Sequence, residues 1–119
     1  MVFLDNDRLG KPHDEDDALR MLRELTGRGH TVCTGVSVRR GETSELFAVS
    51  TRVFFRPATD DEIRAYIKTG EPMDKAGAYG VQSRGALFVE RIDGDFFNVM
   101  GLPVEQLGLV LARFGVKLL

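Results

Sequence analysis

The sequence predicts a single α/β domain, residues 1–119, in which strand pairing is partly antiparallel. Two long runs, 31–40 and 46–56, are rich in apolar and β-branched residues and flank a short glycine turn, which is typical of a hairpin. Three other segments carry apolar residues at helical spacing. The chain has no internal repeat, linker or low-complexity stretch, and its length fits one domain.

The N-terminal part predicts a short strand and then an amphipathic helix. Residues 1–5 are apolar almost throughout, and the turn-forming pair Asn6-Asp7 ends this strand. Residues 14–26 begin with an acidic run, which the positive end of a helix dipole favours. Apolar residues follow at helical spacing, and Gly27 is a natural terminator, so we expect a helix there.

The middle of the chain predicts a hairpin followed by a second helix. The strands are residues 31–40 and 46–56, and the turn lies at residues 40–42. Residues 59–62, Thr-Asp-Asp-Glu, fit a capping box, in which the threonine and glutamate side chains bond each other's backbone N–H groups. The helix that begins there has an apolar side and is expected to end before Gly70.

The C-terminal part predicts one more strand and a last helix. Residues 86–92 form the strand, and an Asp-Gly turn follows at residues 93–94. Residues 103–114 begin with proline, which is favoured at a helix start, and form the helix. We expect its inward side to carry Leu107, Val110 and Leu111.

The composition excludes several functional classes. The net charge is -2, so the chain has no positive field that would hold a nucleic-acid polymer. The single cysteine, Cys33, excludes a disulfide framework and favours a reducing cytoplasm, and its apolar neighbours predict a buried thiol rather than a nucleophile. No apolar stretch approaches the roughly 20 residues of a membrane-spanning helix. We therefore expect no membrane partner.

The standard catalytic motifs are absent from the sequence. It has no nucleophile elbow, no Walker loop and no glycine-rich dinucleotide motif. The two histidines, His13 and His30, lack metal-ligand spacing, and we expect each to be solvated or to cap a helix. Composition and periodicity alone therefore predict a soluble α/β domain without a defined chemistry.

Two lysines lie beside glycine or proline. Lys11 is in the sequence GKP, and Lys75 opens the stretch KAGAYGVQ, which has no charge between Lys75 and Gln82. Backbone N–H groups freed by glycine, with a lysine beside them, suit the crowded negative charge of a polyphosphate. The alternative is that both segments are turns whose lysines face water, and for GKP taken alone that interpretation prevails.

Three long segments of the sequence carry a family resemblance. They read LDNDRLGKP, LTGRGHTVCTGV and EPMDKAGAYGVQSRGALFVERIDGDFFNVMGLP. Together they resemble the Maf family of nucleoside triphosphate pyrophosphatases, and the resemblance covers essentially the whole chain. DKAGAYGVQ and NVMGLP are long, so chance matches should be rare. The resemblance implies a Maf/ITPase-like mixed sheet with flanking helices, of which residues 1–119 are the C-terminal two-thirds.

The resemblance also implies an activity and a set of site residues. Family members hydrolyse nucleoside triphosphates to the monophosphate and pyrophosphate with a divalent metal, usually Mg²⁺. Lys11 and Lys75 would act in catalysis by neutralising the triphosphate, with Asp74 in the same polar pocket. Gly80 would let the main chain approach the nucleotide.

Gln82 matches a family position associated with nucleotide selectivity. A glutamine there is similar to the branch that prefers dTTP and UTP, whereas the branch acting on 7-methyl-GTP carries a glutamate. A carboxamide offers both a donor and an acceptor to a pyrimidine edge, which a carboxylate cannot do. We therefore expect a dTTP/UTP type of specificity.

One part of the family pattern lies outside residues 1–119. In the family, the aspartate that serves as catalytic base, in the sequence Ala-Asp-Thr, immediately precedes the segment that residues 1–4 match. A phosphate-binding loop, Ser-x-Ser-Pro-Arg-Arg, lies further upstream. We therefore expect an N-terminally truncated family fold with uncovered apolar surface and strand edges. The residues that would bind the metal stay unassigned.

Two classes of function remain open at this point. The first is a nucleotide pyrophosphatase acting on dTTP and UTP. The second is a catalytically silent module that binds nucleotides or dimerises, and a remnant without any ligand is a third reading. Members of the Maf family are commonly dimers, so the resemblance favours a homodimer.

Overall fold

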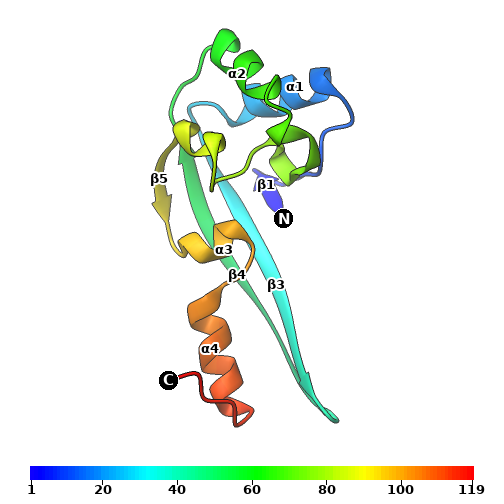
Figure 1. The fold of residues 1–119 in the computed structure, drawn as a ribbon, viewed down its shortest axis with the longest axis vertical. Coiled ribbons are helices and arrows are strands. Elements are labelled where there is room, and N and C mark those ends of the chain that lie inside the picture. Colours follow the sequence, from blue (N-terminus) through cyan, green and yellow to red (C-terminus); the bar gives the residue numbers. More distant parts are fainter.

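The chain forms a five-stranded antiparallel sheet with helices packed around it. In the computed structural model, which describes all of residues 1–119, the strand order is β2-β1-β3-β4-β5. The molecule measures 51 Å in its long dimension and 26 Å in the other two, because a long hairpin extends beyond the rest of the sheet (Figure 1). The predicted α/β class with flanking helices is confirmed, and every strand pair is antiparallel rather than mixed.

The first two strands form a tight hairpin. β1 (Val2–Leu4) is the predicted N-terminal strand, and β2 (Asp7–Leu9) pairs with it. Asp5 turns the chain with a φ of 53°, in the left-handed region that aspartate tolerates better than most residues. The sequence analysis did not predict β2, because only Leu9 of its three residues is buried and no apolar alternation marks it.

The long hairpin is the predicted one. β3 (Gly29–Arg40) and β4 (Thr43–Phe55) pair along their whole length, with Arg40 opposite Thr43 at the turn. β1 pairs only with the first part of β3, where Val2 lies opposite Val32. Backbone hydrogen bonds between Met1 and Cys33 end this pairing, so the rest of β3 has β4 as its only strand neighbour. The expected strand edge is therefore present.

Two helices lie together at one end of the sheet (Figure 1). α1 (Glu15–Leu25) begins where the Asp14 side chain accepts a hydrogen bond from the N–H of Asp17, as its acidic start predicts. α2 (Asp60–Ile67) begins with the predicted capping box of Thr59 and Glu62. The predicted bounds of the first helix, residues 14–26, include both cap residues.

The last third of the chain differs in detail from the prediction. β5 (Val89–Asp93) begins three residues later than predicted, because residues 84–88 form a 3-10 turn against the segment before them. The short helix α3 (Phe96–Met100) was not predicted, whereas α4 (Val104–Arg113) matches the predicted last helix. Both helices lie along the long hairpin (Figure 1).

The core lies between the sheet and the helices at the α1–α2 end. Its 17 buried residues include Val2, Val32, Val53 and Phe55 from the sheet, and Tyr79 from the glycine-rich stretch. The glycine-rich stretch is thus part of the core and is not a surface loop. No helix of the molecule is long and apolar enough to cross a membrane.

Uncovered apolar surface gathers at the other end of the molecule. Leu109 on α4 is 54% exposed, and Leu118 beyond it is 67% exposed. On α4, Val110 is buried as predicted, while Leu107 and Leu111 are only half-buried. Uncovered apolar surface is therefore present at α4 and the residues that follow it.

Candidate active site

The stretch Lys75–Gln82 begins with a tight turn pressed against β1. Gly77 has a φ of 73°, and a Cβ atom on it would lie 3.0 Å from the Val2 side chain. The N–H of Gly77 donates to the carbonyl of Gly10, at 3.0 Å, and this bond holds the Lys11 segment beside the turn. A glycine is needed here both for the backbone angle and for the contact.

The side chain of Lys75 lies across Gly80. A Cβ atom on Gly80 would come within 2.6 Å of Lys75 Cε and 2.9 Å of Cδ. The Lys75 ammonium bonds Asp74 Oδ1 at 3.0 Å. That ammonium, with a smaller contribution from the charge of Lys11, holds the pKa of the exposed Asp74 carboxyl below its usual range. The bare backbone of Gly80 therefore positions a lysine.

Two polar side chains hold the loop that follows. The Tyr66 hydroxyl accepts a hydrogen bond from the N–H of Gly80, and Glu71 Oε2 accepts one from the N–H of Gly85, each at 3.1 Å. Burial raises the pKa of the Glu71 carboxyl, but hydrogen bonds from Tyr66, Ser83 and Gly85 outweigh burial and hold it below its ordinary value. Glu71 is thus a charged acceptor that organises the loop.

A buried histidine lies under the glycine-rich stretch. His30 is fully buried, its Nε2 lies 2.7 Å from the Tyr79 hydroxyl, and its ring packs edge-on against Phe55. Burial, reinforced by the charge of Arg52, lowers the pKa of His30 to about 4. The prediction of a solvated or capping histidine is wrong for His30, because it lies two residues before Val32 on the inward face of β3. The alternation of inward and outward side chains along β3, extended back to residue 30, was the signal in the sequence for a buried histidine.

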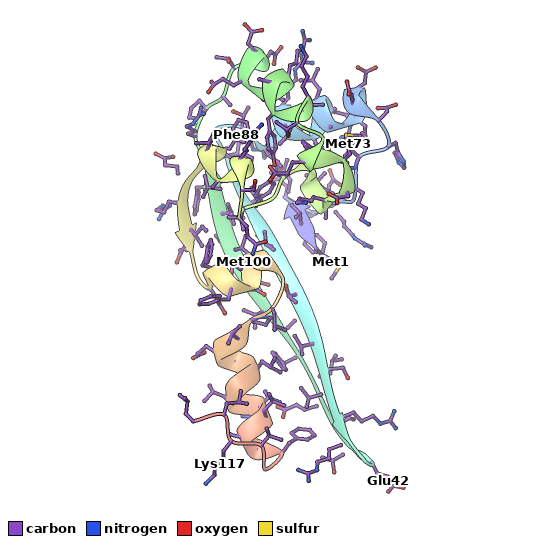
Figure 2. The ribbon with its side chains drawn as sticks, in the orientation of Figure 1. Met1, Glu42, Met73, Phe88, Met100 and Lys117 are labelled. Atoms are coloured by element: carbon purple, nitrogen blue, oxygen red, sulfur yellow. The ribbon has the colours of Figure 1, made fainter.

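A cavity of about 250 Å³ lies where the glycine-rich stretch, β1, β3 and α3 meet. Figure 2 labels Met1 and Met100, which line it from the start of the chain and from α3. Three of the predicted site residues, Lys75, Gly80 and Gln82, line this cavity together. The other lining residues are Met1, Val2, Val32, Thr34, Ala76, Tyr79, Val81, Asn98, Val99, Met100 and Gly101.

The two remaining predicted residues do not line the cavity. Lys11 is exposed and is held near the site only through the bond between Gly10 and Gly77. Asp74 is exposed too, and it reaches the cavity only through its ion pair with Lys75. The structure therefore places one lysine and one amide in the hollow and leaves Lys11 and Asp74 outside it.

Asn98 is a polar residue of the cavity that the sequence analysis did not place in the site. Asn98 is fully buried, although it lies on the otherwise exposed helix α3. Its Nδ2 group donates to the carbonyls of Val32 and Val49. The only available signal was its place in NVMGLP, a segment that the family resemblance singled out.

The residues around the cavity do not form a ligand set for a divalent metal. None of the lining side chains is a carboxylate, and no group of three His, Cys, Asp or Glu side chains gathers anywhere in the chain. Mg²⁺ prefers carboxylate oxygens, water and substrate phosphates. The polar side-chain groups present, an ammonium, two carboxamides and two hydroxyls, do not fit an Mg²⁺ site held by the chain alone.

The fold and the cavity define an α/β protein with a hollow lined by a lysine and amides at the edge of its sheet. The family model described as Maf-like protein matches residues 1–114, and the chain belongs to this family.

Similar curated proteins carry a more specific name. The "dTTP/UTP pyrophosphatase" of Bacillus velezensis is 51% identical over 117 residues, which are 98% of this chain and 62% of that protein. The proteins of the same name from Dictyoglomus turgidum and Geobacillus sp. are 48% and 52% identical, over 100% and 97% of this chain and 63% and 61% of their own lengths. The chain thus spans about three fifths of the length of these relatives.

Gly85→Ala is expected to destabilise the protein by about 1–3 kcal/mol. A Cβ atom there would lie 2.1 Å from the Gly80 carbonyl oxygen and 2.7 Å from the Tyr66 hydroxyl, so the loop beside the cavity must move. Urea unfolding measures the change. The control is Gly108→Ala on α4, where a Cβ atom meets nothing within 4 Å and should stabilise the helix by about 0.5–1 kcal/mol. Equal stability of the Gly85 variant and the wild type would contradict the packing described.

His30 is expected to make the protein less stable in mild acid. Above its ordinary pKa of 6.5 the ring is neutral in both the folded and the unfolded state. Between pH 6.5 and about 4 the unfolded chain binds a proton that the folded protein does not, so the free energy of unfolding falls, by about 2 kcal/mol at about pH 5. Urea unfolding at about pH 7 and about pH 5 measures this. His30→Gln should lose most of the slope, whereas the exposed His13→Gln should keep it.

Proposed function

We propose that this chain binds dTTP and UTP and serves their hydrolysis to the monophosphate and pyrophosphate. The observation that carries the proposal is the shared cavity, in which Lys75, Gly80 and Gln82 meet. The names of the similar proteins support the same substrates. Because those proteins are longer than this chain, the activity of the whole protein is part of the proposal.

Lys75 is suited to a triphosphate because its present partner is weakly held. The Asp74 carboxylate is 78% exposed, and exposed ion pairs contribute about 0–1 kcal/mol. A triphosphate concentrates several negative charges, so it competes with a single carboxylate for the ammonium. Lys11, on the same side of the turn at Gly77, would add a second positive charge at the rim.

Gln82 is suited to a pyrimidine imide. Uracil and thymine present a ring N–H between two carbonyl oxygens, and a carboxamide can accept from the N–H and donate to a carbonyl. Gln82 is exposed and makes no side-chain hydrogen bond within the chain, so its amide is free for such a pair. Cytosine presents the reverse pattern, which a carboxamide can also meet by turning over, so the Gln82 amide by itself does not exclude cytosine.

The reaction requires water to attack the α-phosphorus. A P–O bond forms to the water oxygen, the bond to pyrophosphate breaks, and the water proton passes to a base. The cavity-lining residues include no carboxylate and no histidine. This favours a second candidate function, nucleotide binding without hydrolysis by residues 1–119.

We propose that the divalent cation, Mg²⁺, enters bound to the triphosphate. Mg²⁺ commonly uses substrate phosphates and few protein ligands. The chemistry it supplies when bound is neutralisation of phosphate charge. Lys75 would contribute to that neutralisation from the protein side.

We also propose that the partners are free nucleotides in the cytoplasm and not nucleic-acid polymers, in line with the net charge of -2.

We further propose that the protein is a homodimer through the outward side of α4. An open hollow there is lined mainly by Val104, Leu109, Ala112, Val116 and Leu118. Contiguous apolar surface of this kind marks an interaction site. A second copy presents the same surface, so a two-fold contact would cover both.

Binding of dTTP and UTP in the presence of Mg²⁺ tests the function, with calorimetry for affinity and a phosphate-coupled assay for pyrophosphate release. Gln82→Ala should weaken binding about tenfold, since a bidentate amide pair is worth about 1–3 kcal/mol. Gln106→Ala on α4 is the matched control and should bind like the wild type. Binding without release supports the second candidate, and absence of both from the wild type contradicts the proposal.

The homodimer is tested by sedimentation velocity. The wild type should sediment at about twice the chain mass of 13.2 kDa. Leu109→Glu places a charge on the apolar surface and should give a monomer, whereas Glu105→Gln, which removes a charge from a residue that lines the same hollow, should leave the dimer intact. A monomeric wild type at high micromolar concentration would refute the contact.

A further inference from the structure

Helix α3 is attached to the sheet mainly by polar contacts. Three of its five residues face solvent, with Phe96, Phe97 and Met100 exposed by 43%, 53% and 40%. Asn98 is its single buried residue, and Val99 is half-buried. Since little apolar area of α3 is covered, hydrophobic burial alone does little to fix its position.

Asn98 and Thr51 form a compact polar link between α3 and the hairpin. Nδ2 of Asn98 lies 3.2 Å from the Val32 carbonyl oxygen on β3 and 2.9 Å from the Val49 carbonyl oxygen on β4. It also lies 3.0 Å from the Thr51 hydroxyl, which in turn bonds both backbone groups of Asp95 at the start of α3. The link thus holds both the entry and the middle of the helix.

The orientation of the Asn98 amide is fixed by these partners. Two backbone carbonyl oxygens can only accept hydrogen bonds, so the NH₂ group must face them and the amide oxygen must face elsewhere. Oδ1 is buried and has no partner within the chain. Asn98 lines the cavity, but its side chain is fully buried, so its part there is to hold α3 and not to contact a ligand.

We propose that Asn98 is a positioning residue for the nucleotide cavity, acting with Thr51 through α3. α3 and the residue after it supply Val99, Met100 and Gly101 to the cavity wall. The donor side of the Asn98 amide fixes this wall through its hydrogen bonds to β3 and β4. The inference rests on the proposed nucleotide binding and adds the residues that shape the site.

The link predicts effects at a distance, because Thr51 does not line the cavity. If removal of the link leaves α3 correctly placed for only about a tenth of the time, the apparent Kd rises about tenfold. Asn98→Ala should therefore weaken UTP binding about tenfold or more. Thr51→Val removes one hydroxyl and should weaken it about threefold, with the ratio of UTP to CTP affinity unchanged in both variants, because the population of correctly placed α3 affects both nucleotides equally.

The experiment measures UTP and CTP affinity by calorimetry at a temperature where circular dichroism shows every variant folded. Hydrogen exchange of the Val99, Gly101 and Leu102 amides, which bond within α3, gives a readout that needs no nucleotide. Those amides should exchange about tenfold faster in both variants, while the amides of α1 stay protected. Phe97→Ala, on the exposed side of α3, is the control and should behave like the wild type.

Each outcome decides between the two claims. Wild-type protein that binds no nucleotide refutes the proposed function, and the inference with it. Wild-type binding, together with unchanged affinity and unchanged exchange in folded Asn98→Ala, overturns the inference alone. If Asn98→Ala does not fold, Thr51→Val decides in the same way, because unchanged UTP affinity and exchange in that variant overturn the link.

Discussion

The contact of backbone on backbone between Gly80 and Gly85 is the constraint on which the site depends. The Gly80 carbonyl occupies the place that a side chain at residue 85 would take, and the two N–H groups are bound by Tyr66 and Glu71. This contact folds the chain into a tight loop and leaves Lys75 lying across Gly80. The absence of a side chain at Gly80 therefore leaves the space in which the Lys75 side chain lies, so this wall of the cavity presents a lysine.

The opposite wall of the cavity is held in a different way. α3 buries little apolar surface and is fixed by the hydrogen bonds of Asn98 and Thr51. Polar contacts of this kind have directional requirements, whereas apolar packing tolerates small shifts. The cavity therefore lies between two walls of fixed position, the loop with Gly80 and Gly85 on one side and α3 on the other. The apolar core lies beside the hollow and supplies stability, with His30 and Tyr79 at the boundary between them.

Local chemistry made the helices and the long hairpin predictable, because caps, turns and apolar spacing act over a few residues. The capping box at Thr59 and the acidic start at Asp14 formed as expected. β2 and α3 were missed because they are stabilised by tertiary contacts, such as those of the buried Asn98, and not by local propensity. The family resemblance pointed to Lys75, Gly80 and Gln82, and these three residues line one cavity. It did not reveal that Lys11 lies outside the cavity, since its position in space depends on the bond between Gly10 and Gly77.

The two carboxylates next to the site illustrate how the chain separates structure from binding. Glu71 is half-buried and accepts hydrogen bonds from the loop, so removing its side chain would leave the Gly85 N–H unpaired. Asp74 is exposed and pairs only with Lys75, a contact that water can replace at little cost. A polyanion arriving at the cavity can therefore take the lysine from Asp74 while Glu71 keeps the loop in shape. Glu71 thus keeps the loop backbone fixed, while the weak pairing with Asp74 leaves the Lys75 ammonium available to a ligand.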